Sequence, residues 1–74
     1  MQSVPILEPH EVTKTFEKLG WEVARKRGSH IIMTKKGHIT TLSIPKHPEV
    51  ARGTLRRLIA RADVTVKEFI EACK

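Results

Sequence analysis

The spacing of apolar residues along the chain predicts helical and extended segments, beginning with a helix. Val12, Phe16 and Leu19 recur at intervals of four and three residues, which places them on one face of a helix. Gly20 follows directly, and glycine is common just past the C-terminus of a helix. We therefore expect a first helix over about residues 9–19.

A stretch rich in β-branched residues follows, and two turn signals divide it. Gly28 and Ser29 form the first turn signal, and Lys36 and Gly37 form the second. Two short turns between three consecutive strands predict an antiparallel meander. The predicted strands cover about residues 21–25, 30–35 and 38–44.

Two further helices are predicted after the strands, each with one apolar face. The first opens at Gly53 and Thr54, either of which can cap it. The second opens with a capping box formed by Thr65 and Glu68. Because a three-stranded sheet has one face to bury, we expect the helices on one face and the other face open. The sequence thus predicts an α+β fold of order α-β-β-β-α-α.

Pleat alternation divides the second predicted strand into two faces. Ile31 and Met33 share one face, and His30, Ile32 and Thr34 share the other. If Ile31 and Met33 pack against the helices, the His30 imidazole points to the open face. Histidine is the most frequent general acid or base of enzymes, so His30 is a candidate for proton transfer.

The length of the chain limits the kind of site it can hold. With 74 residues we expect a single domain over residues 1–74, with its core over about 9–73. A domain of this size buries only about 60% of its unfolded surface. A shallow site with few catalytic groups is therefore expected.

Basic residues are concentrated in the middle of the chain. The chain carries 14 Lys and Arg against 8 Asp and Glu, for a net charge of +6. Ten of these cations lie between Arg25 and Arg61, where Glu49 is the only acid. This segregation favours a polyanionic partner, namely nucleic acid, an acidic protein or an anionic membrane surface. A basic surface with no specific partner is the alternative.

Cysteine usage and hydropathy indicate the compartment. Cys73 is the only cysteine, which excludes an internal disulfide and a cysteine zinc cluster. The first residues lack the pattern of a signal peptide, and no apolar run approaches the ~20 residues of a membrane span. We therefore expect a cytoplasmic protein with no membrane association, metal or cofactor.

Several short motifs occur in order along the chain, and they are Gly20-Trp21, Arg27-Gly28-Ser29-His30, Ile44-Pro45-Lys46-His47, Gly53-Thr54-Leu55-Arg56-Arg57-Leu58-Ile59 and Glu68-Phe69. In this order and with these spacings they are similar to HicA-type toxins, also called YcfA-like, which are small mRNA interferases of toxin–antitoxin pairs. The resemblance spans about residues 10–72. It implies a fold like the double-stranded RNA-binding domain, cleavage of RNA that requires the histidine of the Gly-Ser-His motif, and a HicB-type antitoxin that covers this histidine.

His30 is the predicted catalytic residue of an endoribonuclease, acting as general acid or base. RNA carries its own nucleophile, because its 2′-OH can attack the adjacent phosphorus, so few protein groups and no metal are needed. Ser29 is a candidate hydrogen-bond donor to a phosphate oxygen, and His47 is a second proton-transfer group, a phosphate ligand or a solvated loop residue. The family often has a second histidine or an aromatic residue after this one, whereas this chain has Ile31 and Ile32. Candidate RNA-binding residues are Arg25, Lys26, Arg27, Lys35, Lys46 and Arg56.

Two other functions stay open. A non-catalytic RNA-binding module needs the cationic surface but not His30, and a protein-interaction domain would use that surface to bind an acidic partner. Trp21 fits a core anchor better than a base-stacking platform. Four arginines near the second predicted helix fit RNA binding, antitoxin docking or a solvated helix face, and these are Arg52, Arg56, Arg57 and Arg61.

Overall fold

The computed structural model describes residues 4–46 and 49–74, which form an α+β structure. Its elements follow the predicted order of one helix, three strands and two helices. The α-β-β-β-α order that the family resemblance implies is therefore present. The elements are α1 (Pro9–Lys18), β1 (Glu22–Arg27), β2 (His30–Thr34), β3 (Leu42–Pro45), α2 (Arg52–Arg61) and α3 (Val66–Cys73).

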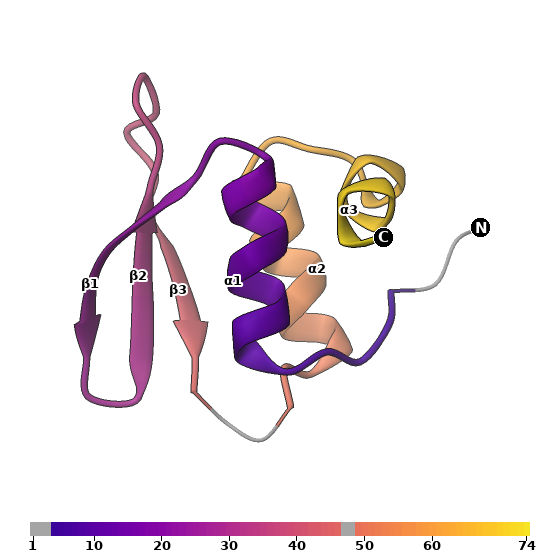
Figure 1. Cartoon of the computed structure of the whole chain (residues 1–74), viewed down its shortest axis with the longest axis horizontal. Coiled ribbons are helices and arrows are strands. Elements are labelled where there is room, and N and C mark those ends of the chain that lie inside the picture. The colour runs from indigo at the N-terminus through magenta and orange to yellow at the C-terminus, as the bar shows by residue number, and fades with distance from the viewer. Residues whose placement is uncertain (1–3, 47–48) are drawn as a thin grey trace.

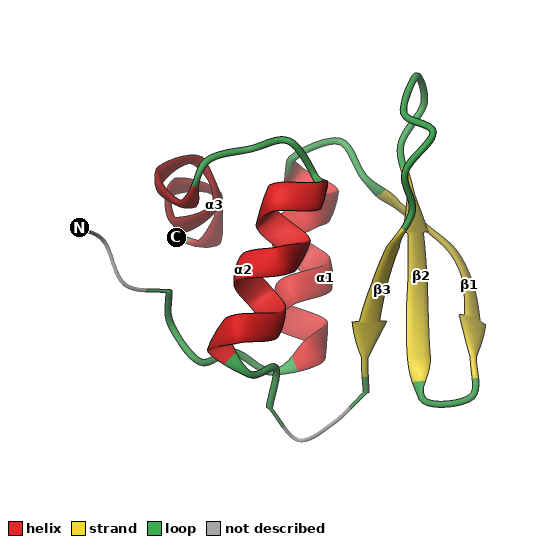
Figure 2. Cartoon of the chain, turned by 180° about the vertical axis from the view of Figure 1, so that it is seen from behind, coloured by secondary structure: helices red, strands yellow, loops and turns green. Residues whose placement is uncertain are grey.

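The three strands form one antiparallel sheet, and the helices lie on one side of it (Figure 1). β2 is the central strand, flanked by β1 and β3. α1 and α2 pack against the sheet, whereas α3 lies on the far side of these two helices and packs on both (Figure 2). The predicted bare face of the sheet is confirmed. The helices differ from the prediction in one respect, because α3 covers other helices and not the sheet.

An aromatic pair holds α3 against α1. The ring centroids of Phe16 and Phe69 lie 5.1 Å apart, with their planes inclined by 56°. Aromatic pairs favour such tilted arrangements, and both rings are fully buried. Phe69 therefore anchors α3 on the helical layer.

The hydrophobic core fills the space between the sheet and the helices. Ile31 and Met33 of β2, together with Leu42 and Ile44 of β3, are buried on this side. This confirms the predicted faces of β2. The alternate residues of β2 and β3 therefore belong to the open face.

The third strand begins later than predicted. Residues 35–41 form a loop that projects beyond the sheet, in place of the predicted short turn (Figure 1). A turn does form there, since the His38 N–H donates to the Lys35 carbonyl over 2.9 Å. Ile39 stays fully exposed, so strand pairing resumes only where Leu42 reaches the core.

The second helix begins earlier than predicted. α2 starts at Arg52, and its N-cap is Ala51 without a side-chain cap, so Gly53 and Thr54 lie inside the helix. The reason is a tertiary contact: the buried Val50 forms a β-bridge to Leu7, and the chain turns into the helix directly afterwards.

The start of the third helix agrees with the prediction. The Thr65 Oγ1 accepts a hydrogen bond from the Glu68 N–H over 3.0 Å. The Glu68 Oε1 in turn accepts from the Thr65 N–H over 2.7 Å. These two bonds confirm the predicted capping box. The box could be predicted because it depends only on residues three apart in the sequence.

Candidate functional site

The turn between β1 and β2 places His30 at the start of the central strand. Gly28 has a φ of 54°, a left-handed conformation that glycine adopts at little cost. A positive φ at the first of two turn residues is typical of a type II′ turn, whose twist matches that of paired strands. The end of β3 is tied to the same turn, because the Lys46 N–H donates to the Ser29 carbonyl over 2.6 Å. The backbone around His30 is therefore held by both neighbouring strands.

The His30 imidazole is exposed on the open face of the sheet. Its Nδ1 lies 3.4 Å from the Ser29 Oγ, a long hydrogen bond in which either group can donate. If Ser29 donates, Nε2 carries the ring proton, and if Nδ1–H donates, Nε2 is a free acceptor. In both tautomers Nε2 has no hydrogen-bond partner among the described residues, so it is available to a bound substrate.

The register of the first hairpin brings two arginines to the same face as His30. Arg27 pairs with His30, and Arg25 pairs with Ile32. Cross-strand partners point to the same face of a sheet. Two guanidinium groups therefore extend from the strand next to the imidazole.

A β-bulge at Ala24 gives the arginines this orientation. Val23 pairs with Met33 on the helix side, and the next paired residue along β1 is Arg25, so Ala24 has no partner. In a regular strand Val23 and Arg25 would share a face. The bulge leaves Val23 opposite Met33 on the helix side and turns Arg25 to the open face.

β3 contributes two residues to this face that the sequence analysis missed. Pro45 pairs with His30, and Ser43 pairs with Ile32. Ser43 could have been found from its position between the apolar residues Leu42 and Ile44, which are both buried. We call the residues gathered here the open-face site, and they are Arg25, Arg27, His30, Ile32, Ser43 and Pro45.

Two of the predicted RNA-binding lysines lie away from the open-face site. Lys26 pairs with Ile31 and therefore lies on the helix side of β1. Lys35 lies beyond the other end of β2, about 17 Å from His30 at the usual rise of a strand. Its Nζ donates to the Leu19 carbonyl over 3.2 Å, so this lysine joins the sheet to the end of α1.

The remaining predicted residues differ in how close they lie to the open-face site. Lys46 is exposed and adjoins Ser29 through the backbone hydrogen bond, so it borders the open-face site. Arg56 is exposed on α2, which packs on the opposite side of the sheet. His47 lies outside the described residues.

The α2 arginines do not share one environment. The Arg52 Nε donates to the Val4 carbonyl over 3.0 Å, which ties the N-terminal segment to α2. Arg56, Arg57 and Arg61 are exposed. Arg52 thus has a structural contact, whereas the other three present their charge to solvent.

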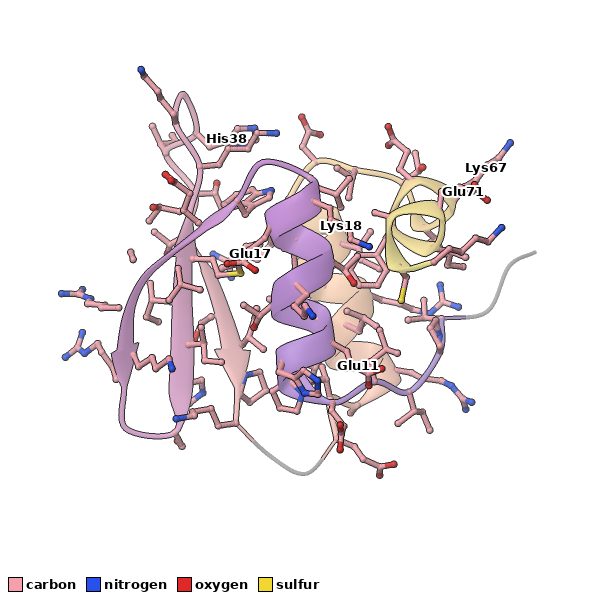
Figure 3. The ribbon with its side chains drawn as sticks, in the orientation of Figure 1. Glu11, Glu17, Lys18, His38, Lys67 and Glu71 are labelled. Carbon is pink, nitrogen blue, oxygen red and sulfur yellow. The ribbon has the colours of Figure 1, made fainter. Side chains whose placement is uncertain are left out.

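The central cations are not neutralised by neighbouring carboxylates. Among the described residues, the ion pairs within 4.0 Å lie outside the span from Arg25 to Arg61. The acidic side chains labelled in Figure 3, Glu11, Glu17 and Glu71, come from α1 and α3. The positive charge of the sheet and of α2 is therefore free to attract a polyanion.

Trp21 belongs to the core, as predicted. Its side chain is 1% exposed, and its Nε1 has no hydrogen-bond partner among the described residues. The ring of His38 lies next to the Trp21 ring, with centroids 5.3 Å apart and planes inclined by 58°. Trp21 is therefore not available to stack on a nucleic-acid base.

Comparison with known families identifies the class of protein. A family model described as the HicA toxin of bacterial toxin–antitoxin systems matches residues 9–64, which is more than half of the chain. The chain belongs to the HicA toxin family. Membership of this family implies an antitoxin partner, and α3 lies beyond the matched residues of this HicA chain. A search of curated proteins finds no match.

No helix among the described residues is long and apolar enough to cross a membrane. Within residues 4–46 and 49–74, no three His, Cys, Asp or Glu side chains come together as a set of metal ligands.

Proposed function

We propose that this HicA-family toxin is an endoribonuclease that cleaves mRNA in the cytoplasm without a metal, using His30 as general acid or base. The observation that supports the proposal is the position of His30. It is exposed on the bare face of the sheet, with Arg27 as its cross-strand neighbour. A flexible single strand of RNA can lie on such a face without entering a cleft.

The chemistry needs few groups from the protein. The 2′-oxygen attacks the adjacent phosphorus while its proton passes to a base, and the bond to the 5′-oxygen breaks as that oxygen takes up a proton. The products are a 2′,3′-cyclic phosphate and a free 5′-OH. We assign one of the two proton transfers to the Nε2 of His30. Arg25 and Arg27 stabilise the negative charge that develops on the phosphate oxygens.

Further residues are proposed to support this reaction. The Ser29 hydroxyl orients the imidazole through Nδ1 or donates to a phosphate oxygen, and Lys46 extends the cationic surface beside the turn. We propose His47 for the second proton transfer. Lys35 and Arg56 are proposed as outlying contacts to the RNA backbone, Lys26 as a contributor to the positive potential of β1 that acts on the RNA through space, and a HicB-type protein as the antitoxin that covers His30.

The test compares the wild type with His30→Ala on single-stranded RNA in the presence of EDTA. His10→Ala is the matched control, because His10 is also exposed but lies on α1. We expect His30→Ala to lose at least about a hundredfold in rate, the usual contribution of a general acid or base, and His10→Ala to cleave normally. A 2′-deoxy nucleotide at the cleaved position should block the reaction. Equal cleavage by the wild type and His30→Ala, or loss of activity with EDTA alone, would contradict the proposal.

A non-catalytic RNA-binding module is the second candidate, and one observation favours it. The open-face site as defined holds one imidazole and no carboxylate, whereas cleavage involves two proton transfers. A binding module would retain RNA affinity in both the wild type and His30→Ala and would release no cyclic phosphate. The same experiment therefore separates the two functions.

A further inference from the structure

The outer edge of β1 is a backbone surface that the proposed reaction does not use. β1 is an edge strand, and all six of its residues are exposed. In an antiparallel ladder, alternate residues of an edge strand direct their N–H and C=O groups away from the neighbouring strand. A two-residue turn is closed by a hydrogen-bonded pair, here Arg27 with His30, so the preceding residue Lys26 faces outward.

The opposite edge of the sheet is less suited to accept a strand. β3 has only four residues, and it ends in Pro45, which has no N–H to donate. α1 and α2 both pack near β3, whereas only α1 approaches β1. Of the two edges, β1 is therefore the longer and the less covered one.

The charges on β1 determine what can pair with it. Arg25, Lys26 and Arg27 are consecutive, and none of them has an ion-pair partner among the described residues. A second copy of the chain would bring these cations opposite one another, and like charges directly opposite destabilise a strand pair. An acidic strand would instead neutralise them. Val23, which is 36% exposed, offers a small apolar contact near the other end of β1.

We propose that the free edge of β1 binds an extended acidic segment of the antitoxin, which adds a fourth strand to the sheet. Main-chain hydrogen bonds supply affinity in this mode of recognition, and alternate side chains supply specificity. The side chains of the added strand that point to the open face lie beside Arg25 and Arg27. The added strand therefore neutralises the cations that flank His30. The inference rests on family membership and is independent of RNA cleavage.

The probe is a synthetic peptide of alternating glutamate and valine with blocked ends, titrated into the full chain at low salt. Amide hydrogen exchange, followed by NMR, reports where the peptide binds. We expect slower exchange at the outward-facing Lys26 amide and unchanged exchange in α2. A peptide with lysine in place of glutamate should not bind, because it repels the three cations.

Two variants of the same residue separate the backbone contribution from the charge. Lys26→Pro removes the outward N–H, and proline is tolerated on an edge strand whose N–H faces solvent. Lys26→Gln is the matched control, since it removes the charge and keeps the N–H. Loss of a hydrogen bond and of backbone fit should weaken peptide binding about tenfold in Lys26→Pro. Lys26→Gln should weaken it only about twofold, as expected for one exposed charge.

Equal affinities of the two variants, protection located outside β1, or no binding at low salt would overturn the proposal. If Lys26→Pro does not fold, as judged by circular dichroism, the protection of the Lys26 amide in the wild type decides alone. Because the assay contains no RNA, its failure is distinguishable from a failure of the proposed nuclease activity.

Discussion

Replacing Arg27 with glutamine is expected to reduce RNA cleavage far more than the same replacement at its neighbour Lys26. Both changes remove one positive charge from an exposed residue of β1. The register, however, places Arg27 opposite His30 on the open face and Lys26 opposite Ile31 on the helix side. Because both variants lose one charge, comparing them tests which face of the strand each side chain occupies and not the number of charges.

The magnitudes follow from these positions. A hydrogen bond from a charged group contributes about 1.5–3 kcal/mol, so loss of the Arg27 contact to phosphate corresponds to a roughly 10- to 150-fold decrease in kcat/KM. Lys26 can act on a phosphate at the open face only through space. Across about 10 Å of water, two unit charges interact by ~0.4 kcal/mol, and salt screening lowers this to ~0.1 kcal/mol. Lys26→Gln should therefore change kcat/KM by less than about twofold.

The assay measures kcat/KM on a fluorogenic single-stranded RNA over a series of salt concentrations. For Arg27→Gln, the slope of log affinity against log salt should decrease by about 0.7, the value for one lost phosphate contact to a single strand. For Lys26→Gln the slope should change little. Circular dichroism is the check that both variants fold. Equal losses in the two variants would refute the assignment of faces, and full activity of Arg27→Gln would refute its role at the phosphate.

Three further predictions concern the stability of the fold, and urea unfolding measures each of them. Phe69→Ala should lower the free energy of unfolding by about 3–5 kcal/mol, because it leaves a cavity against Phe16 in the core. This loss is a large part of the roughly 4–11 kcal/mol expected for a chain of this length. A loss below about 1 kcal/mol would show that the surrounding residues close the cavity. Thr65→Ala should cost about 1 kcal/mol through loss of the bond from the Glu68 N–H, and an unchanged midpoint would mean that the cap is replaced by water. Gly28→Ala should cost about 1–2 kcal/mol through its φ of 54° alone, because its Cβ meets no atom within 4 Å, whereas Gly28→Asn should cost less; equal losses would point to a steric cause.

The helices could be predicted from the sequence where their signals are local. The stripe of Val12 and Phe16 and the capping box at Thr65 depend on residues within one or two turns, and the structure confirms them. The start of α2 could not be predicted in this way. It depends on the bridge between Val50 and Leu7, which are distant in the sequence, and no local cap marks it.

The face of His30 could also be predicted, because Ile31 and Met33 alternate with it and supply the apolar side of the strand. The same reasoning could not show that Arg25 and Arg27 lie on the open face of the sheet while Lys26 lies on the helix side. A run of three cations has no internal alternation, so its orientation depends on the pairing with β2 and on the bulge. The role of His30 in RNA cleavage and the HicB type of the antitoxin stay proposals.

Two constraints act on β1 from its two ends, and the bulge is what satisfies both. The turn fixes Arg27 opposite His30, which places Arg27 and then Arg25 on the open face by regular alternation. At the other end of β1, Val23 stands opposite the buried Met33, so it belongs to the helix side of the strand although its own side chain is 36% exposed. Four residue steps separate Val23 from Arg27, and an even number of steps in a regular strand would give both the same orientation. With Ala24 left out of the ladder, Val23 lies opposite Met33 while Arg25 and Arg27 lie on the face of His30, so the bulge sets the surface on which the proposed chemistry depends.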